Sequence, residues 1–257
     1  LQPLGNYVSF LFTTEWPLPP FGIEILAALA RFRKKRERGK KRPGSRVLRT
    51  RPMPDIRSFI FDIGNVILPF DFNRALRRVQ ARTVVPLESL AAAFRPLQDD
   101  YESGRIGHGQ FVEQSIAMMR FEGTPAEFVA AWREIFEENP AMTRLVEQLR
   151  PRYPLYLLSN TSDLHLDYII SQYPVFDHFT DAVYSYRVGC LKPARSIYEI
   201  AARQFGVEPG QTVFIDDLPA NVAAARECGF HAIRYELARH DALIEELAAL
   251  GVAGLEP

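Results

Sequence analysis

The sequence predicts an α/β fold, a doubly wound parallel sheet with a helical cap inserted after its first strand. Short, mainly apolar runs, such as SFIFDI at 58–63, are typical of strands buried on both faces of a parallel sheet. Later in the chain such runs alternate with helical patterns, which indicates strand–helix–strand units. A block of helical pattern separates the first run from the second. The 257 residues, 47% of them apolar, suffice for one α/β domain with an insertion.

The first 57 residues differ from the rest in charge. They hold 13 Lys and Arg against four Asp and Glu, whereas residues 58–257 hold 18 against 27. The basic end of segment 22–42 could contact nucleic acid or anionic lipid, but a solvated run of charge is the simpler explanation. The sequence begins with Leu, and Met53 precedes the first strand, so an over-long gene assignment would also account for residues 1–52. We expect residues 1–57 to form a basic, disordered extension.

The helical cap is predicted over residues 73–136. Apolar residues spaced three and four apart indicate helices, and Gly, Pro, Thr or Asn bounds each segment. These segments are 72–82, 85–104, 109–123 and 124–136. Residues 58–72 and 137–257 are then expected to form the core domain.

The remainder of the core is predicted as alternating strands and helices. Apolar runs predict the strands, and the amphipathic segments between them predict the helices. In chain order these are helix 139–154, strand 153–161, helix 162–174, strand 181–186, helix 195–206, strand 211–217, helix 218–229 and strand 230–236. In an open parallel sheet of this kind, ligands bind in the crevice outside the carboxyl ends of the strands.

Polar residues stand at the carboxyl ends of these predicted strands. Taken singly, each has a simpler explanation, since Ser, Asn and Asp are common helix caps and most lysines lie at the surface. Two adjacent acids at the end of a buried strand are unfavourable without a cation, which favours a metal site. We therefore expect one pocket that contains Asp62, Ser159 and Asn160, Lys192 before Pro193, and the pair Asp216 and Asp217.

Four motifs of the chain resemble those of the haloacid dehalogenase-like (HAD) hydrolase superfamily. They are FDIGNV at 61–66, LSNT at 158–161, GCLKP at 189–193 and FIDDLPAN at 214–221. Their order and spacing make a specific signal, although each motif alone would be weak. The resemblance covers roughly residues 57–240 and implies a Rossmann-like HAD core with a helical cap. Within the superfamily, the chain is similar to bacterial α-D-glucose-1-phosphate phosphatase-like members and to the phosphatase domain of epoxide hydrolases.

The resemblance implies a nucleophile and a metal. Asp62 would attack the phosphorus atom of the substrate and form an aspartyl-phosphate, which water then cleaves. The cofactor would be Mg²⁺, which prefers oxygen ligands. Its protein ligands would come from Asp62, the backbone carbonyl of Gly64, and the acid pair. Asp217 would be the direct ligand of that pair, and Asp216 would orient the site or a bound water.

The same resemblance assigns three groups to the substrate phosphate. Lys192 would be catalytic, because its charge holds Asp62 and stabilises the phosphate oxygens. Ser159 would donate a hydrogen bond to a phosphate oxygen, helped by backbone N–H groups where the next helix starts. Asn160 would add a further donor.

Gly64 stands where most phosphatases of this family carry a second Asp, which protonates the leaving alkoxide. A metal-independent 2-haloacid dehalogenase is one alternative, because halide leaves without a proton. Those enzymes lack the acid pair, so Asp216 and Asp217 favour a phosphatase. A non-catalytic phosphate-binding protein is another alternative. A phosphate ester on carbon 1 of an aldose needs less help from a proton donor than an ordinary alkyl ester. His165 is another candidate for the donor that position 64 lacks.

The expected substrate is a small phosphorylated metabolite, with sugar phosphates as the leading class. The cap should close over the pocket and contact the leaving group, since such lids exclude water from the reaction. Candidate residues for this contact are Phe70, Phe72, Asn73, Tyr101 and Glu102.

Cys190 and Cys228 have neither disulfide-framework nor metal-ligand spacing, which predicts a reducing, cytoplasmic compartment. No apolar window reaches the length of a membrane span, so no membrane partner is expected. Nucleic acid is not an expected partner of the core. The sequence leaves the oligomeric state open.

Overall fold

The computed structural model describes residues 53–71, 74, 78–80, 82–83 and 85–256, with the side chains of 87–93 left out. It divides the chain between Pro52 and Met53. Predictions for residues 1–52 lie outside the described residues. Residues 53–57 belong with the body, because Ile56 is buried in its core and the Arg57 N–H donates to the Gln211 carbonyl at 2.8 Å. The body therefore starts before the boundary expected from the sequence.

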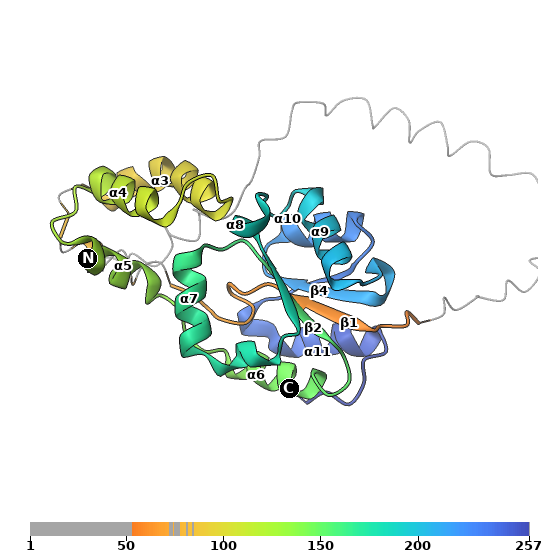
Figure 1. Ribbon diagram of the computed structural model, residues 1–257. Coiled ribbons are helices and arrows are strands. Elements are labelled where there is room, and N and C mark those ends of the chain that lie inside the picture. The colour runs from red at the N-terminus through yellow and green to blue at the C-terminus, as the bar shows by residue number, and fades with distance from the viewer. Residues whose placement is uncertain (1–52, 72–73, 75–77, 81, 84, 257) are drawn as a thin grey trace, which may run out of the picture. The chain divides into compact units, whose positions relative to one another are not determined.

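The body is built on a five-stranded sheet in the order β3-β2-β1-β4-β5, and every neighbouring pair is parallel (Figure 1). The central strand β1 pairs with β2 and β4, so Phe59 lies opposite both Leu155 and Val213. This arrangement confirms the predicted parallel sheet. The strands are β1 (Ser58–Phe61), β2 (Leu155–Ser159), β3 (Asp181–Tyr184), β4 (Thr212–Asp216) and β5 (His231–Arg234).

Helices cover both faces of the sheet, as the uninterrupted apolar strands predict. Side chains alternate between the faces, so Phe59 and Phe61 pack with one layer of helices and Ile60 with the other. The first layer holds α6 (Pro140–Leu149), α7 (Asp163–Gln172) and α11 (His240–Ala249). The second holds α9 (Arg195–Phe205) and α10 (Pro219–Glu227). Short helices complete the connections: α8 (Ser185–Val188), η2 (Pro174–His178), η3 (Pro209–Gln211) and η4 (Leu237–Arg239).

The cap contains α3 (Leu87–Glu102), α4 (His108–Met119) and α5 (Pro125–Arg133), which lie to one side of the sheet in Figure 1. Its own core is aromatic. The Phe111 ring stacks on Tyr101 at 4.2 Å between centroids and contacts Phe94 and Trp132 at 5.8 and 5.7 Å. The cap thus has a hydrophobic cluster of its own, distinct from the two layers on the sheet.

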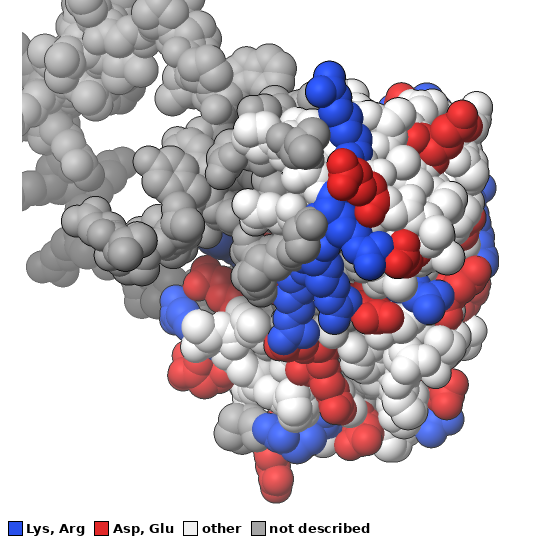
Figure 2. Space-filling view, turned by 90° about the vertical axis from the view of Figure 1, so that its left-hand side faces the viewer, with Lys and Arg blue, Asp and Glu red and all other residues white. Residues whose placement is uncertain are grey.

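Ion pairs join arginines near the start of the cap to glutamates near its end. Arg78 pairs with Glu134 at 2.9 Å, Arg82 pairs with Glu127 at 2.6 Å, and Arg74 pairs with Glu137. Figure 2, which faces the cap, shows basic and acidic side chains interleaved on this surface. Because these pairs are exposed, each contributes little alone, roughly 0–1 kcal/mol.

Two features of the core differ from the sequence prediction. The predicted strand 181–186 ends at Tyr184, and Ser185 begins the one-turn helix α8. Helix α11 follows β5, which the sequence pattern predicts as the last element. Among the described residues, no helix is long and apolar enough to cross a membrane.

Candidate active site

Asp62 lies directly after β1, at the carboxyl end of the central strand. Its N–H donates to the Ile215 carbonyl at 2.9 Å, which continues the sheet ladder by one residue. A tight turn follows, in which the Ile63 carbonyl accepts from the Ile67 and Leu68 N–H groups at 2.9 and 3.0 Å. The carboxylate accepts from the Ile63 N–H at 2.7 Å. The side chain is only 11% exposed, and this bond holds its carboxylate in one orientation.

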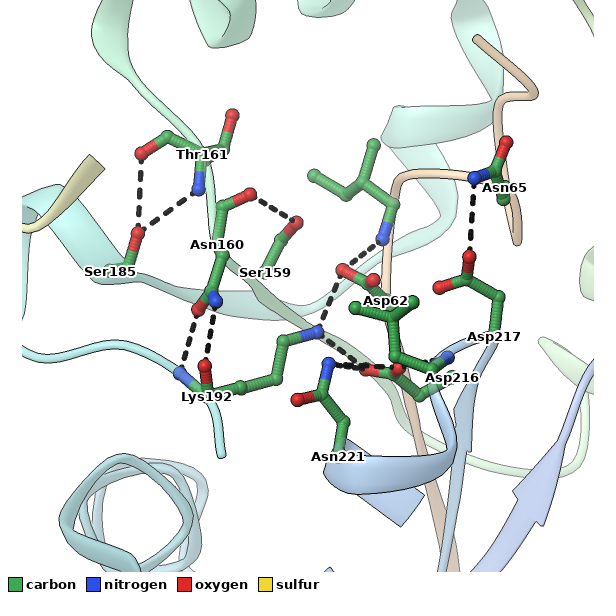
Figure 3. Close-up of polar contacts among 12 residues, drawn as sticks. Asp62, Asn65, Ser159, Asn160, Thr161, Ser185, Lys192, Asp216, Asp217 and Asn221 are labelled. Carbon is green, nitrogen blue, oxygen red and sulfur yellow. Dashed lines mark hydrogen bonds and ion pairs between the residues drawn. The ribbon is translucent and has the colours of Figure 1, made fainter. Parts of the chain in front are cut away.

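Lys192 joins two carboxylates at this point (Figure 3). Its Nζ atom lies 2.9 Å from Asp62 Oδ1 and 2.6 Å from Asp216 Oδ2, and the side chain is 1% exposed. Burial alone would lower the pKa of Lys192, but the charges of Asp216 and Asp62 outweigh it and raise that pKa. The lysine therefore stays protonated. Burial raises the pKa of Asp62; the Lys192 charge opposes this, and the Asp216 charge adds to it.

Both carboxylate oxygens of Asp216 are engaged by protein donors. Oδ1 accepts from the Leu218 N–H at 2.9 Å and from Asn221 Nδ2 at 3.0 Å. Oδ2 accepts from Lys192 at 2.6 Å and from Asn221 at 3.1 Å. Asp216 is fully buried, so its charge is satisfied inside the protein and serves to hold Lys192. Asn221 belongs to the FIDDLPAN motif, but the sequence pattern assigned it no role.

Asp217 is the more open acid of the pair. Asn65, which has a left-handed backbone with φ 54°, donates from Nδ2 to Asp217 Oδ2 at 3.1 Å. Burial raises the pKa of Asp217 to about 7, and the charges of Asp62 and Asp216 add to that shift. One ligand atom from each of these three acids lies within 4.8 Å of the others.

This donor set fits Mg²⁺, because it consists of hard carboxylate oxygens with more negative charge than Lys192 can balance. Gly64, whose carbonyl was expected as a further ligand, stands two residues after Asp62 in the tight turn and bridges to Leu68.

Ser159 and Asn160 follow β2 and lie beside the same cluster. Ser159 is 2% exposed, and its hydroxyl lowers the pKa of Asp62 by hydrogen bonding. The Asn160 side chain binds the backbone of Lys192, accepting from its N–H at 2.8 Å and donating to its carbonyl at 2.9 Å. In this structure Asn160 therefore positions Lys192, a role that the sequence pattern did not reveal.

The Ser185 hydroxyl connects the end of cap helix α3 to the loop that follows β2. Ser185 accepts from the Thr161 N–H at 3.0 Å and donates to the Glu102 carbonyl at 2.5 Å. Glu102 ends α3, and Gln98 Nε2 donates to its Oε1 at 2.8 Å. Burial raises the pKa of the Glu102 carboxyl to about 7, and the charge of Asp62 also raises it. Glu102 is therefore a cap acid whose protonation responds to the charge of Asp62.

His165 does not fit the role of an acid. It is buried, stacks parallel to Trp132 at 6.2 Å between centroids, and its Nε2 lies 3.3 Å from the Trp132 carbonyl. Burial lowers its pKa to about 4, so the ring is neutral at physiological pH. It packs between cap and core instead.

Four further residues were expected to contact the leaving group, and the structure describes two of them, Tyr101 and Phe70. Tyr101 donates to Asp163 and is 3% exposed, so its hydroxyl is committed within the protein. Phe70 packs on Phe136 at 6.1 Å between centroids. Phe72 and Asn73 lie outside the described residues.

The chain matches a family model described as haloacid dehalogenase-like hydrolase over residues 56–229. A D-ribitol-5-phosphate phosphatase of Bacteroides thetaiotaomicron is 26% identical over 190 residues, 70% of this chain and 92% of that protein. A predicted HAD-like family hydrolase of Porphyromonas gingivalis has a TM-score of 0.65 at 29% identity, over 75% of this chain and 98% of that chain. The HAD family enzyme BT-2542 of B. thetaiotaomicron, solved with magnesium and inorganic phosphate, has a TM-score of 0.65 at 25% identity, over 71% and 95% of the two chains.

The family match runs from the residues before β1 to the end of α10, so it includes the cap and every strand except β5. It confirms the resemblance seen in the four motifs. The strand-end acids and Lys192 all lie within the matched range. The chain belongs to the haloacid dehalogenase-like hydrolase family and is an enzyme.

Proposed function

We propose that this hydrolase is a Mg²⁺-dependent phosphatase that acts on small phosphorylated metabolites, sugar phosphates in particular, through an aspartyl-phosphate formed on Asp62. The cluster of Asp62, Asp216 and Asp217 around the buried Lys192 carries the proposal. Two of the comparisons support it: one is with a D-ribitol-5-phosphate phosphatase, and one is with an enzyme solved with magnesium and phosphate.

Asp62 is the nucleophile of this proposal. It stands at the end of the central strand, and Lys192 at 2.9 Å offsets the repulsion between its charge and an incoming phosphate. The position of Lys192 is fixed at both ends, because Asp216 binds its ammonium and Asn160 binds its backbone. Ser159, buried beside Asp62, would donate to a phosphate oxygen.

Asp62, Asp217 and the Gly64 carbonyl would hold Mg²⁺. Asp216 would act through Lys192 and the orientation of its neighbours, since its two oxygens already have protein donors. Bound Mg²⁺ neutralises negative charge on the carboxylates and on the phosphate oxygens. The raised pKa of Asp217 agrees with this role, because a cation would relieve the repulsion among the three acids.

The dehalogenase remains the runner-up. Halide displacement has no use for an acid cluster that gathers excess negative charge beside the nucleophile. Release of chloride from 2-chloropropionate without added metal would favour the dehalogenase over the phosphatase. Binding of phosphate without any turnover would favour the non-catalytic alternative.

The decisive experiment measures inorganic phosphate released from p-nitrophenyl phosphate and from a panel of sugar and sugar-alcohol phosphates. Wild type is compared with Asp62→Asn, each with Mg²⁺ and with EDTA. Asp167→Asn is the matched control, because this aspartate is exposed on α7. We expect release that requires both Asp62 and Mg²⁺ and that Asp167→Asn leaves intact.

The panel also ranks leaving groups. Sugar 1-phosphates compared with 5- and 6-phosphates test the preference for anomeric esters that Gly64 suggests. Full activity of Asp62→Asn, or full activity in EDTA, would refute the mechanism. The cytoplasmic location predicted from the cysteines stays a prediction; Cys190 and Cys228 are both free thiols in the structure.

A further inference from the structure

We propose that Glu102, at the end of cap helix α3, is the general acid and base of the reaction and replaces the carboxylate that is missing at Gly64. The inference rests on the phosphatase function proposed above. A phosphatase of this kind must protonate the leaving oxygen and later deprotonate water. The carboxylates of Asp62, Asp216 and Asp217 are committed to the proposed metal site.

Position 64 is closed to a side chain by its own surroundings. A Cβ atom built on Gly64 would lie 2.8 Å from Cε1 and 3.3 Å from Cδ1 of the Phe70 ring. Phe70 is held in place, because it bridges to Phe136 through the backbone and packs against that ring. A proton donor at this position would need the ring to move. The acid must therefore come from another element.

The backbone of Glu102 is fixed beside the loop that leaves β2. Ser185, fully buried, donates to its carbonyl at 2.5 Å and accepts from the Thr161 N–H at 3.0 Å. Thr161 lies two residues after Ser159, on the loop that leaves β2. The end of α3 is thus tied to the loop that presents the expected phosphate-binding serine.

The Glu102 carboxyl is suited to exchanging a proton. Gln98 Nε2 donates to Oε1 at 2.8 Å, which leaves Oε2 to carry the proton. Burial raises the pKa of this carboxyl to about 7, so both protonation states are accessible near neutral pH. The charge of Asp62 also contributes to this rise.

Among the residues whose side chains are described, few other charges act on this carboxyl. Asp99 raises its pKa and Arg95 lowers it, both from α3 itself. The charged side chains of the two helices packed on α3 are exposed, namely His108 and Glu113 of α4 and Arg187 of α8.

The proton balance of the two steps is complete with Glu102 alone. In the first step, an Asp62 oxygen bonds to phosphorus while the bond from phosphorus to the leaving oxygen breaks, and the Glu102 proton passes to that oxygen. In the second step, the Glu102 carboxylate takes a proton from water. The water oxygen bonds to phosphorus and the bond to Asp62 breaks, which releases inorganic phosphate and restores the acid.

An acid on the cap also widens the substrate class. Gly64 alone would restrict the enzyme to esters that leave without help, such as anomeric phosphates. With Glu102 protonated, primary alkyl phosphates become substrates as well.

The test compares leaving groups in Glu102→Gln, which preserves the acceptor for Gln98 but carries no exchangeable acid. Rapid-mixing experiments measure the first-turnover release of p-nitrophenolate and, separately, of the alcohol of the best sugar phosphate. p-Nitrophenolate leaves without a proton, whereas an alkoxide does not. Glu113→Gln is the matched control, because this glutamate is exposed on α4.

We expect Glu102→Gln to slow release of the alcohol by about 100-fold or more and to change the p-nitrophenolate burst by less than about threefold. The fall of wild-type kcat/KM for the sugar phosphate above a pH of about 7 should vanish in the variant. Equal loss with both substrates would show a structural role and overturn the inference, as would no loss with either. If phosphate release by the wild type did not depend on Asp62, the proposed function itself would be overturned.

Discussion

The side-chain amide of Asn160 binds both backbone polar groups of Lys192, at 2.8 and 2.9 Å. It thereby fixes the residue whose ammonium lies between two carboxylates. We expect Asn160→Ala to lower kcat by about 100-fold with KM changed less than about threefold, because displacement of a catalytic group by about 1 Å has that effect. Steady-state kinetics with the best panel substrate measures this.

Gln204→Ala is the control for that change. Gln204 also donates from a side-chain amide to a backbone carbonyl, that of Ala182 at 3.1 Å, but at the surface. Gln204→Ala should leave kcat unchanged. A larger effect on KM than on kcat in Asn160→Ala would instead show that the amide contacts the substrate.

Removal of the lysine charge should destabilise the fold. Lys192→Met leaves the fully buried Asp216 without its cation, a change that costs about 3–5 kcal/mol when one partner of a buried pair is lost. Arg195→Met removes an exposed pair with Glu199 and should change stability by less than about 1 kcal/mol. Urea unfolding of both variants measures the difference. Similar values for the two would contradict the buried-pair interpretation.

Gly64 and Phe70 should be energetically coupled. Gly64→Ala brings Cβ to 2.8 Å from the ring, so we expect a loss of about 1–3 kcal/mol from overpacking. Phe70→Leu in the same chain should relieve part of that loss. A double-mutant cycle in urea measures the coupling. Strictly additive effects would mean that the ring moves aside without strain.

Asp217 should make the metal-free protein less stable as pH rises. Its pKa is about 7 in the folded state against an ordinary value of 3.8, so the folded state binds the proton more tightly. Stability from this group is then fully present below a pH of about 4 and falls by on the order of 3 kcal/mol as pH rises through 7. Thermal melts in EDTA of wild type and Asp217→Asn, between pH 5 and 8, isolate the contribution.

Mg²⁺ should reverse this trend. Because protons compete with the metal for Asp217, the rise in Tm on adding Mg²⁺ should be larger at pH 8 than at pH 5. Asp217→Asn should show little rise at either pH. The same rise at both pH values in wild type would place the metal elsewhere.

The sequence was informative about the core for a physical reason. Buried parallel strands leave a clear apolar pattern, and all their carboxyl ends meet at one edge. That pattern predicts that Asp62 and Asp216 lie together. Lys192 comes after α8 and not directly after a strand, and its ion pairs with both acids show that it joins them. Their chemical roles stay predictions.

Other parts of the fold and of the candidate site are less evident from the sequence. The Asn160 amide could equally well bind a phosphate oxygen or a backbone group. The sequence does not show which, because its partner, Lys192, lies 32 residues further along the chain. Glu102 ends an amphipathic helix among other acids, and only the packed cap shows its connection to Ser185. Helix α11 begins without a side-chain cap, so the usual start signal is absent. The aromatic residues that flank Ser185 on both sides favour a strand, although it begins a helix.

The order of strands in the sheet also has a consequence for how the chain folds. Strand β1 is the first to leave the ribosome, yet both its neighbours, β2 and β4, come after the whole cap. It must wait unpaired, with four buried side chains, until residues 155–159 appear. All buried residues of the cap cluster except Leu164 lie within residues 79–135, so most of this cluster can form while β1 waits. Closing so long a loop is slow, and during synthesis the exposed strand is where chaperones are most needed.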